Sequence, residues 1–162
     1  MPGLEDLYRE IILDHYRNPR NRGELASPPA TRVEGFNPLC GDEVVVYLDV
    51  EEGRVTDVKI NGQGCSISQS SASMMSSAVK GKTIDEVRAL IRAFKAMMSI
   101  HEQRLDGDAD GELVEDDADT EVKLGDLEAL QGVVKFPVRI KCATLGWITL
   151  AQGLDEAHAA TA

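Results

Sequence analysis

The sequence predicts an α+β fold, in which helices pack against a small antiparallel β-sheet. One observation is the alternation of apolar and polar residues between positions 31 and 61, interrupted by a turn at Glu51-Glu52-Gly53. The other is the abrupt change of composition after Cys65, where apolar residues begin to recur at helical spacing. Strands that are followed by a run of helices are typical of the α+β class.

The N-terminal part is predicted to contain a helix, a loop and the strands of the sheet. Residues 4–17 have apolar side chains at helical spacing, and Asn18-Pro19 ends this helix. Residues 20–30 are predicted to form a loop. Strands are predicted at residues 31–35, 43–50 and 54–61, and the last two form a hairpin.

Helices are predicted in the rest of the chain. The segment Ser66–Lys80 is rich in small residues, which let a helix lie close against a sheet, and Gly81 ends it. Thr83 and Glu86 have the spacing of a capping box for a second helix that runs to about Ser99. Two more helices are predicted, a short one near Leu124–Leu130 and a last one that starts between Pro137 and Cys142 and runs towards Ala157.

The length and composition favour a single domain over residues 1–162, with an acidic loop inserted at about 105–122. Hydrophobic residues make up 43% of the chain and aromatic residues 4%, so aliphatic side chains must dominate the core. Methionine fills irregular gaps in such cores. The residues predicted to pack in the core rather than to form a binding surface include Trp147, Leu150, Met74, Met75, Met97 and Met98.

The charge of the chain excludes some classes of partner. The formal net charge is -11, from 17 basic and 28 acidic residues, and it repels nucleic-acid phosphates and anionic lipids. No apolar run is long enough to span a bilayer, and the N-terminal residues lack the order of a signal peptide. We therefore expect a cytoplasmic protein without a nucleic-acid or membrane partner. In that reducing setting, cysteines favour metal binding or catalysis over a disulfide.

The three cysteines all lie where one predicted element meets the next. Cys40 precedes a strand, Cys65 precedes a helix, and Cys142 lies in the first turns of the last helix. The alternative interpretation is that they are small buried hydrophobic residues. Their boundary positions favour a metal site instead, because Asp42, two residues after Cys40, adds an oxygen to three sulfurs. Such a set is sufficient for tetrahedral zinc.

Three motifs that contain these cysteines resemble the IscU/NifU-like family, specifically its SufU branch. They are NPLCGD, GQGCSIS and RIKCATLGW, they occur in this order, and the resemblance covers nearly the whole chain. It implies an antiparallel sheet packed by helices, with a metal site at one end. It also implies that zinc is held by Cys40, Asp42, Cys65 and Cys142.

The resemblance further implies that the protein is a sulfurtransferase in iron–sulfur cluster assembly. It would act as co-substrate and activator of a pyridoxal-phosphate-dependent cysteine desulfurase of the SufS type. A histidine of that enzyme would take the place of Cys40 on zinc, and Cys40 would accept the persulfide sulfur. The sulfur would then go to a downstream assembly scaffold. The loop position of Cys40, between proline and glycine, independently favours Cys40 as the mobile ligand.

Two departures from the scaffold members of the family favour the sulfurtransferase. Scaffold members have a histidine immediately before their last cysteine, whereas this chain has Lys141, whose ammonium group cannot donate to a metal. They also have an LPPVK-type segment, which this chain replaces with KFPVR at residues 135–139. The alternative function is a scaffold that assembles and transfers a [2Fe–2S] cluster, with iron or the cluster at the same site.

Other residues have a functional and a structural interpretation. Arg139 and Lys141 would stabilise a thiolate or persulfide anion near Cys142, or they lie on a solvated helix face. His15 contributes to a partner surface or is structural. Residues 106–117 fit part of an EF-hand loop, although the twelfth position is Asp117, so a calcium-binding regulatory module is the alternative of another class.

Overall fold

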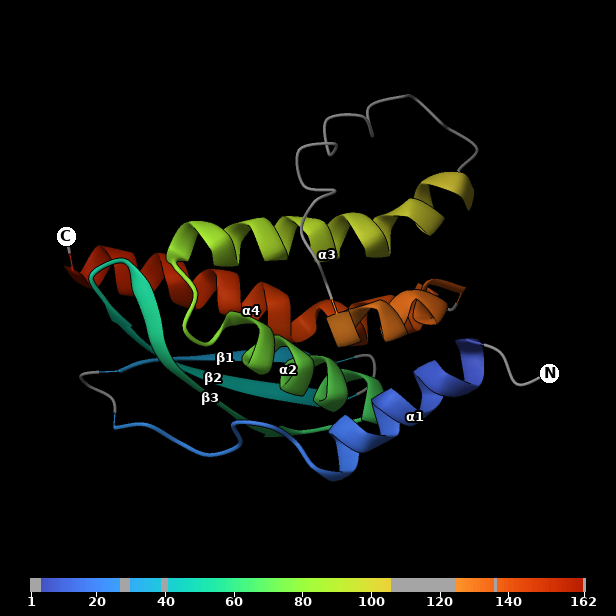
Figure 1. Ribbon diagram of the computed structural model, residues 1–162, viewed down its shortest axis with the longest axis horizontal. Helices are drawn as coiled ribbons and strands as arrows, with labels where there is room; N and C mark the ends of the chain where they lie inside the picture. Colours follow the sequence, from blue (N-terminus) through green and yellow to red (C-terminus); the bar gives the residue numbers. More distant parts are fainter. Residues whose placement is uncertain (1–3, 27–29, 39–40, 106–124, 136, 162) are drawn as a thin grey trace.

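The computed structural model describes residues 4–26, 30–38, 41–105, 125–135 and 137–161. A first helix precedes the strands of a sheet, and further helices follow the sheet (Figure 1), so the α+β prediction is confirmed. In chain order the elements are α1 (Leu4–Arg17), β1 (Thr31–Asn37), β2 (Asp42–Glu51), β3 (Arg54–Gln63), α2 (Ser66–Val79), α3 (Ile84–Leu105), the 3-10 helix η2 (Gly125–Lys135) and α4 (Pro137–Thr161).

The sheet is antiparallel, with β2 between β1 and β3. The predicted hairpin of β2 and β3 is confirmed, and Glu51 pairs with Arg54 across its turn. The turn residues Glu52 and Gly53 have φ angles of 53° and 74°. Positive φ at both central residues is the geometry of a type I′ turn, which matches the natural twist of a hairpin.

Helices cover one face of the sheet. Figure 1 shows α4 between the sheet and α3, while α2 lies against the sheet beside α4. The alternating residues Val44, Val46 and Leu48 of β2 are buried in the core. This arrangement follows from the period of two in a strand, which places every second side chain on the helix-covered face.

The helices α2 and α4 are joined through Trp147, which is buried as predicted. Its ring stacks on that of Phe94 with centroids 4.6 Å apart. Its Nε1 donates to Ser71 Oγ at 3.2 Å, and the Ser71 hydroxyl donates to the carbonyl of Ala143 at 2.6 Å. Leu150, Met74, Met75 and Met98 are also buried, and Met97 packs against the core. These contacts fix the relative position of the two helices that carry Cys65 and Cys142.

Two predicted helix boundaries are wrong. Helix α3 runs to Leu105 and not to about Ser99, because residues 100–105 contain neither glycine nor proline to end it. The short helix is a 3-10 helix that reaches Lys135. Ala129 is buried, and the larger buried residues Leu127, Leu130 and Val133 recur at every third position, which suits the three residues per turn of this helix type.

The interpretation of His15 as part of a partner surface is also wrong. Its ring is buried, and Nδ1 lies 2.8 Å from Ser73 Oγ. The same hydroxyl oxygen accepts a hydrogen bond from the backbone N–H of Arg20 at 2.8 Å. His15 therefore helps to fix α1 and the segment after it against α2.

None of the helices in the described ranges is both long enough and apolar enough to cross a membrane. The acidic segment 106–121 and His101 lie outside the residues whose side chains the structure describes. The calcium-binding interpretation of this segment accordingly stays a prediction from the sequence.

Candidate metal centre

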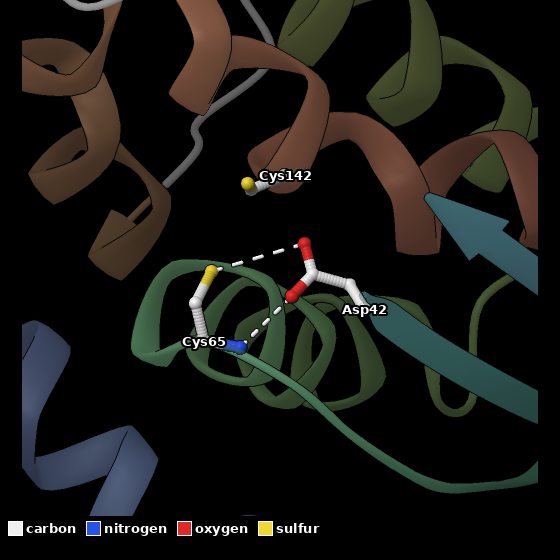
Figure 2. Close-up of side chains that lie close together, drawn as sticks. All are labelled: Asp42, Cys65 and Cys142. Carbon is white, nitrogen blue, oxygen red and sulfur yellow. Dashed lines mark hydrogen bonds between the residues drawn. The ribbon is translucent and has the colours of Figure 1, made fainter. Parts of the chain in front are cut away.

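Asp42, Cys65 and Cys142 come together at one end of the sheet (Figure 2). One donor atom of each residue lies within 4.8 Å of the donor atoms of the other two. Asp42 is the first residue of β2, Cys65 is the N-cap of α2, and Cys142 lies in the second turn of α4. Three elements that are distant in sequence therefore contribute to one cluster.

The carboxylate of Asp42 is fully buried and is oriented by hydrogen bonds. Its Oδ1 accepts from the backbone N–H of Cys65 at 2.8 Å, which leaves Oδ2 3.8 Å from Cys65 Sγ. Burial raises the pKa of Asp42, but hydrogen bonds from the Cys65 N–H and from neighbouring side chains lower it more, so the net pKa lies below the usual value. The carboxylate is thus ionised at neutral pH, the form in which it can coordinate a metal.

Cys65 is positioned by the start of α2. Its backbone is extended, with φ -72° and ψ 167°, and its Sγ accepts from the N–H of Ser68 at 3.5 Å. This is the arrangement of a helix N-cap, in which a side chain accepts one of the N–H groups that have no partner in the first turn. The cap directs Sγ towards Asp42.

Gly64 lets the chain approach Asp42 closely. It has φ +151°, and a Cβ at this position would lie 2.4 Å from Asp42 Oδ1 and 2.9 Å from Asp42 Cα. No side chain fits there unless Asp42 moves. The glycine before Cys65 is therefore required for the close approach to Asp42, and not only for the turn.

We expect Gly64→Ala to weaken metal binding and to destabilise the protein, because the new methyl group displaces the Asp42 carboxylate. The control is Gly81→Ala, since Gly81 also has a positive φ, +85°, but nothing within 4 Å of the added Cβ. Thermal unfolding and zinc titration should show that Gly64→Ala is less stable than the control by about 1–3 kcal/mol, the usual cost of overpacking. Equal stability and equal zinc affinity of the two variants would contradict this role.

Cys142, in the second turn of α4, is fully buried. Its Sγ lies 3.7 Å from Asn37 Nδ2 and 3.8 Å from the carbonyl oxygen of Val138, one turn earlier. Asn37 is a residue that the sequence interpretation missed. It precedes Pro38 in the sequence, and it occupies an inward position of the alternation in β1.

The donor set fits zinc. Tetrahedral zinc with bonds of about 2.3 Å to sulfur and about 2.0 Å to oxygen has a sulfur and an oxygen ligand atom roughly 3.5 Å apart. The 3.8 Å between Cys65 Sγ and Asp42 Oδ2 is close to this separation. Cys40, the predicted fourth ligand, lies outside the described residues, so its place in the set stays a prediction.

Arg139 and Lys141 lie on α4, and both residues are exposed. Lys141 is adjacent to the buried Cys142 in sequence, but its exposed position suits a solvated helix face. A role of these cations in stabilising a sulfur anion stays a prediction.

Comparison with known proteins identifies the family. The profile of the NifU-like N-terminal domain matches residues 7–143. The chain is 44% identical to the zinc-dependent sulfurtransferase SufU of Bacillus subtilis, over 94% of this chain and 92% of that protein. It is 34% identical to the iron–sulfur cluster assembly scaffold protein IscU of Streptococcus pyogenes, over 94% of this chain and 86% of that protein.

A solved structure agrees with this similarity. The N-terminal part of a NifU-like protein from Brucella abortus superposes with a TM-score of 0.74 at 27% identity, over 96% of this chain and 98% of that one. None of these similarities is to a calcium-binding regulatory protein, so the calcium alternative gains no support. The chain belongs to the IscU/SufU family, whose shared NifU-like N-terminal domain it contains, and it is an iron–sulfur cluster assembly protein.

Proposed function

We propose that this protein is a zinc-dependent sulfurtransferase, which accepts persulfide sulfur from a cysteine desulfurase and passes it to the cluster-assembly machinery. The observation that carries the proposal is the cluster of Asp42, Cys65 and Cys142, beside which Lys141 stands in place of a metal-binding histidine. The similarity to a zinc-dependent sulfurtransferase supports the same assignment.

In this proposal, zinc is held by Asp42, Cys65, Cys142 and the predicted ligand Cys40. Bound zinc keeps coordinating thiols deprotonated and protects them from oxidation. Asp42, Cys65 and Cys142 are fixed by a strand end and two helices, and Asp42 and Cys142 are fully buried. These three residues are suited to hold the ion, and Cys40 is suited to react.

The proposed transfer is a thiol–persulfide exchange without net oxidation. The thiolate of Cys40 attacks the terminal sulfur of the persulfide on the desulfurase cysteine. A new S–S bond forms at Cys40 as the S–S bond of the enzyme breaks. The desulfurase cysteine leaves as a thiolate, and the proton of the terminal sulfur stays on the new persulfide. The partner is proposed to be a pyridoxal-phosphate-dependent enzyme of the SufS type, and the acceptor a downstream scaffold.

A scaffold for a [2Fe–2S] cluster is the second candidate, because the same donor residues can bind iron and a relative with 34% identity is named as a scaffold. Lys141 favours the sulfurtransferase over the scaffold. A protonated lysine has no lone pair for a metal, and this side chain is exposed. The chain thus lacks the extra donor that scaffold members place beside their last cysteine.

We expect protein purified without added metal to contain about one zinc ion per chain, as a tetrahedral site of this type implies. It should also accelerate alanine release from cysteine by a desulfurase, and its zinc should persist through treatment with iron and sulfide. Lys141→His is a matched variant, because it restores the donor of the scaffold members and should retain more iron–sulfur cluster than the parent. A stable, transferable [2Fe–2S] cluster on the metal-free parent, together with no acceleration of the desulfurase, would instead identify a scaffold.

A further inference from the structure

One additional side chain reaches into the metal centre. Asn37, the last residue of β1, is 6% exposed, and its Nδ2 lies 3.4 Å from Asp42 Oδ2 and 3.7 Å from Cys142 Sγ. The amide nitrogen carries two protons, so this group can donate to both atoms. It links a ligand on β2 to a ligand on α4.

The position of Asn37 is fixed by the sheet. Asn37 and Asp42 are paired across β1 and β2 at the end of the ladder. Paired residues on adjacent strands project to the same face, and their Cβ atoms lie about 4.5–5.5 Å apart. The strand register therefore places the Asn37 amide next to the Asp42 carboxylate. A residue in a mobile loop would not be held in this position.

The charge of the proposed centre requires such donors. Three thiolates and one carboxylate around a divalent zinc ion leave a net negative charge in a buried place, and buried charge is costly without hydrogen bonds. Backbone N–H groups of Cys65 and Ser68 already donate to Asp42 Oδ1 and Cys65 Sγ. Asn37 supplies donors to the other carboxylate oxygen and to the sulfur of Cys142.

We propose that Asn37 is a positioning residue of the metal centre, whose amide holds Asp42 and Cys142 in ligand geometry and offsets their negative charge. This inference rests on the proposed function, because it concerns the same zinc site. It differs from an ordinary structural role in one respect. A structural amide stabilises the fold with or without metal, whereas Asn37 acts on metal affinity and ligand geometry in addition to stabilising the fold.

Gln69 provides a matched control. Gln69 is 7% exposed, and its Nε2 donates to the carbonyl of Glu43 at 3.4 Å and to Ser68 Oγ at 3.2 Å. Neither acceptor belongs to a proposed ligand side chain. Replacing Asn37 or Gln69 with leucine thus removes a buried amide of similar exposure, but only the Asn37 change removes donors from ligand atoms.

The test compares Asn37→Leu, Asn37→Thr and Gln69→Leu with the parent. Zinc affinity is measured by competition with a chromophoric chelator, ligand geometry by the absorption spectrum of the cobalt-substituted protein, and stability by thermal unfolding without metal. We expect the two leucine variants to lose similar metal-free stability. Asn37→Leu alone should lose about 10–100-fold in zinc affinity, as removal of a group that orients a ligand commonly does, and should change the cobalt–thiolate bands. Asn37→Thr keeps one donor and should lose less.

Zinc affinity and cobalt spectra that are the same in Asn37→Leu and Gln69→Leu would overturn the inference. If Asn37→Leu does not fold, the comparison of Asn37→Thr with Gln69→Leu decides in the same way. Failure of the proposed function has a different signature, since the parent itself would then bind no zinc or fail to accelerate the desulfurase.

Discussion

Cys40→Ala is expected to abolish persulfide acceptance while the protein keeps its fold and part of its zinc. The variant removes the proposed acceptor sulfur but leaves Asp42, Cys65 and Cys142, whose donor atoms lie within 4.8 Å of one another. Water commonly completes a zinc site with three protein ligands. The measurement is incubation with a desulfurase and cysteine, followed by mass spectrometry of peptides to locate the added sulfur.

The matched control is Asp42→Ala, which keeps the Cys40 thiol but removes the oxygen ligand. We expect this variant to lose activity through weakened zinc binding, although its acceptor sulfur is present. The two variants therefore separate loss of the acceptor from loss of the metal geometry. Normal persulfide on Cys65 or Cys142 of the Cys40→Ala protein, at the turnover rate of the parent, would show that Cys40 is not the acceptor.

Cys142→Ala is expected to lose most zinc affinity and the stability that zinc confers. Its sulfur is fully buried and belongs to the helix-anchored part of the site, so no nearby water can replace it easily. A ligand present at 1,000 times its dissociation constant stabilises a protein by about 4.1 kcal/mol. The variant should lose a zinc-dependent stabilisation of about this size. Thermal unfolding with and without zinc measures the loss.

The control for Cys142→Ala is Thr144→Ala on the same helix. Thr144 is half-buried, and its hydroxyl donates to the carbonyl of Ile140 within α4. This change should leave the zinc-dependent shift in melting temperature intact. If Cys142→Ala shows the full zinc-dependent shift of the parent, Cys142 is not a ligand.

Local patterns in the sequence account for most of the fold. The alternation in β2 and the turn at Glu52-Gly53 specify the hairpin, because side-chain direction and positive φ are properties of neighbouring residues. The spacing of Thr83 and Glu86 likewise specifies the start of α3, where each side chain bonds to the backbone N–H of the other. The ends of α3 and η2 lie beyond the predicted ones, since weak stop signals and packing decide where a helix ends.

The sequence by itself also determined the candidate donors, because thiols and a carboxylate at element boundaries are recognisable by residue type and position. Only the tertiary structure decided that Asp42, Cys65 and Cys142 meet, since their approach depends on how α2 and α4 pack on the sheet. The contacts of Gly64 and Asn37 with the candidate donors are likewise visible only in the tertiary structure. Glycine and asparagine are common in turns for local reasons, so their type alone does not reveal these contacts. The close approach of Gly64 to Asp42 and the contact of the Asn37 amide with Cys142 each join segments that are far apart in the chain.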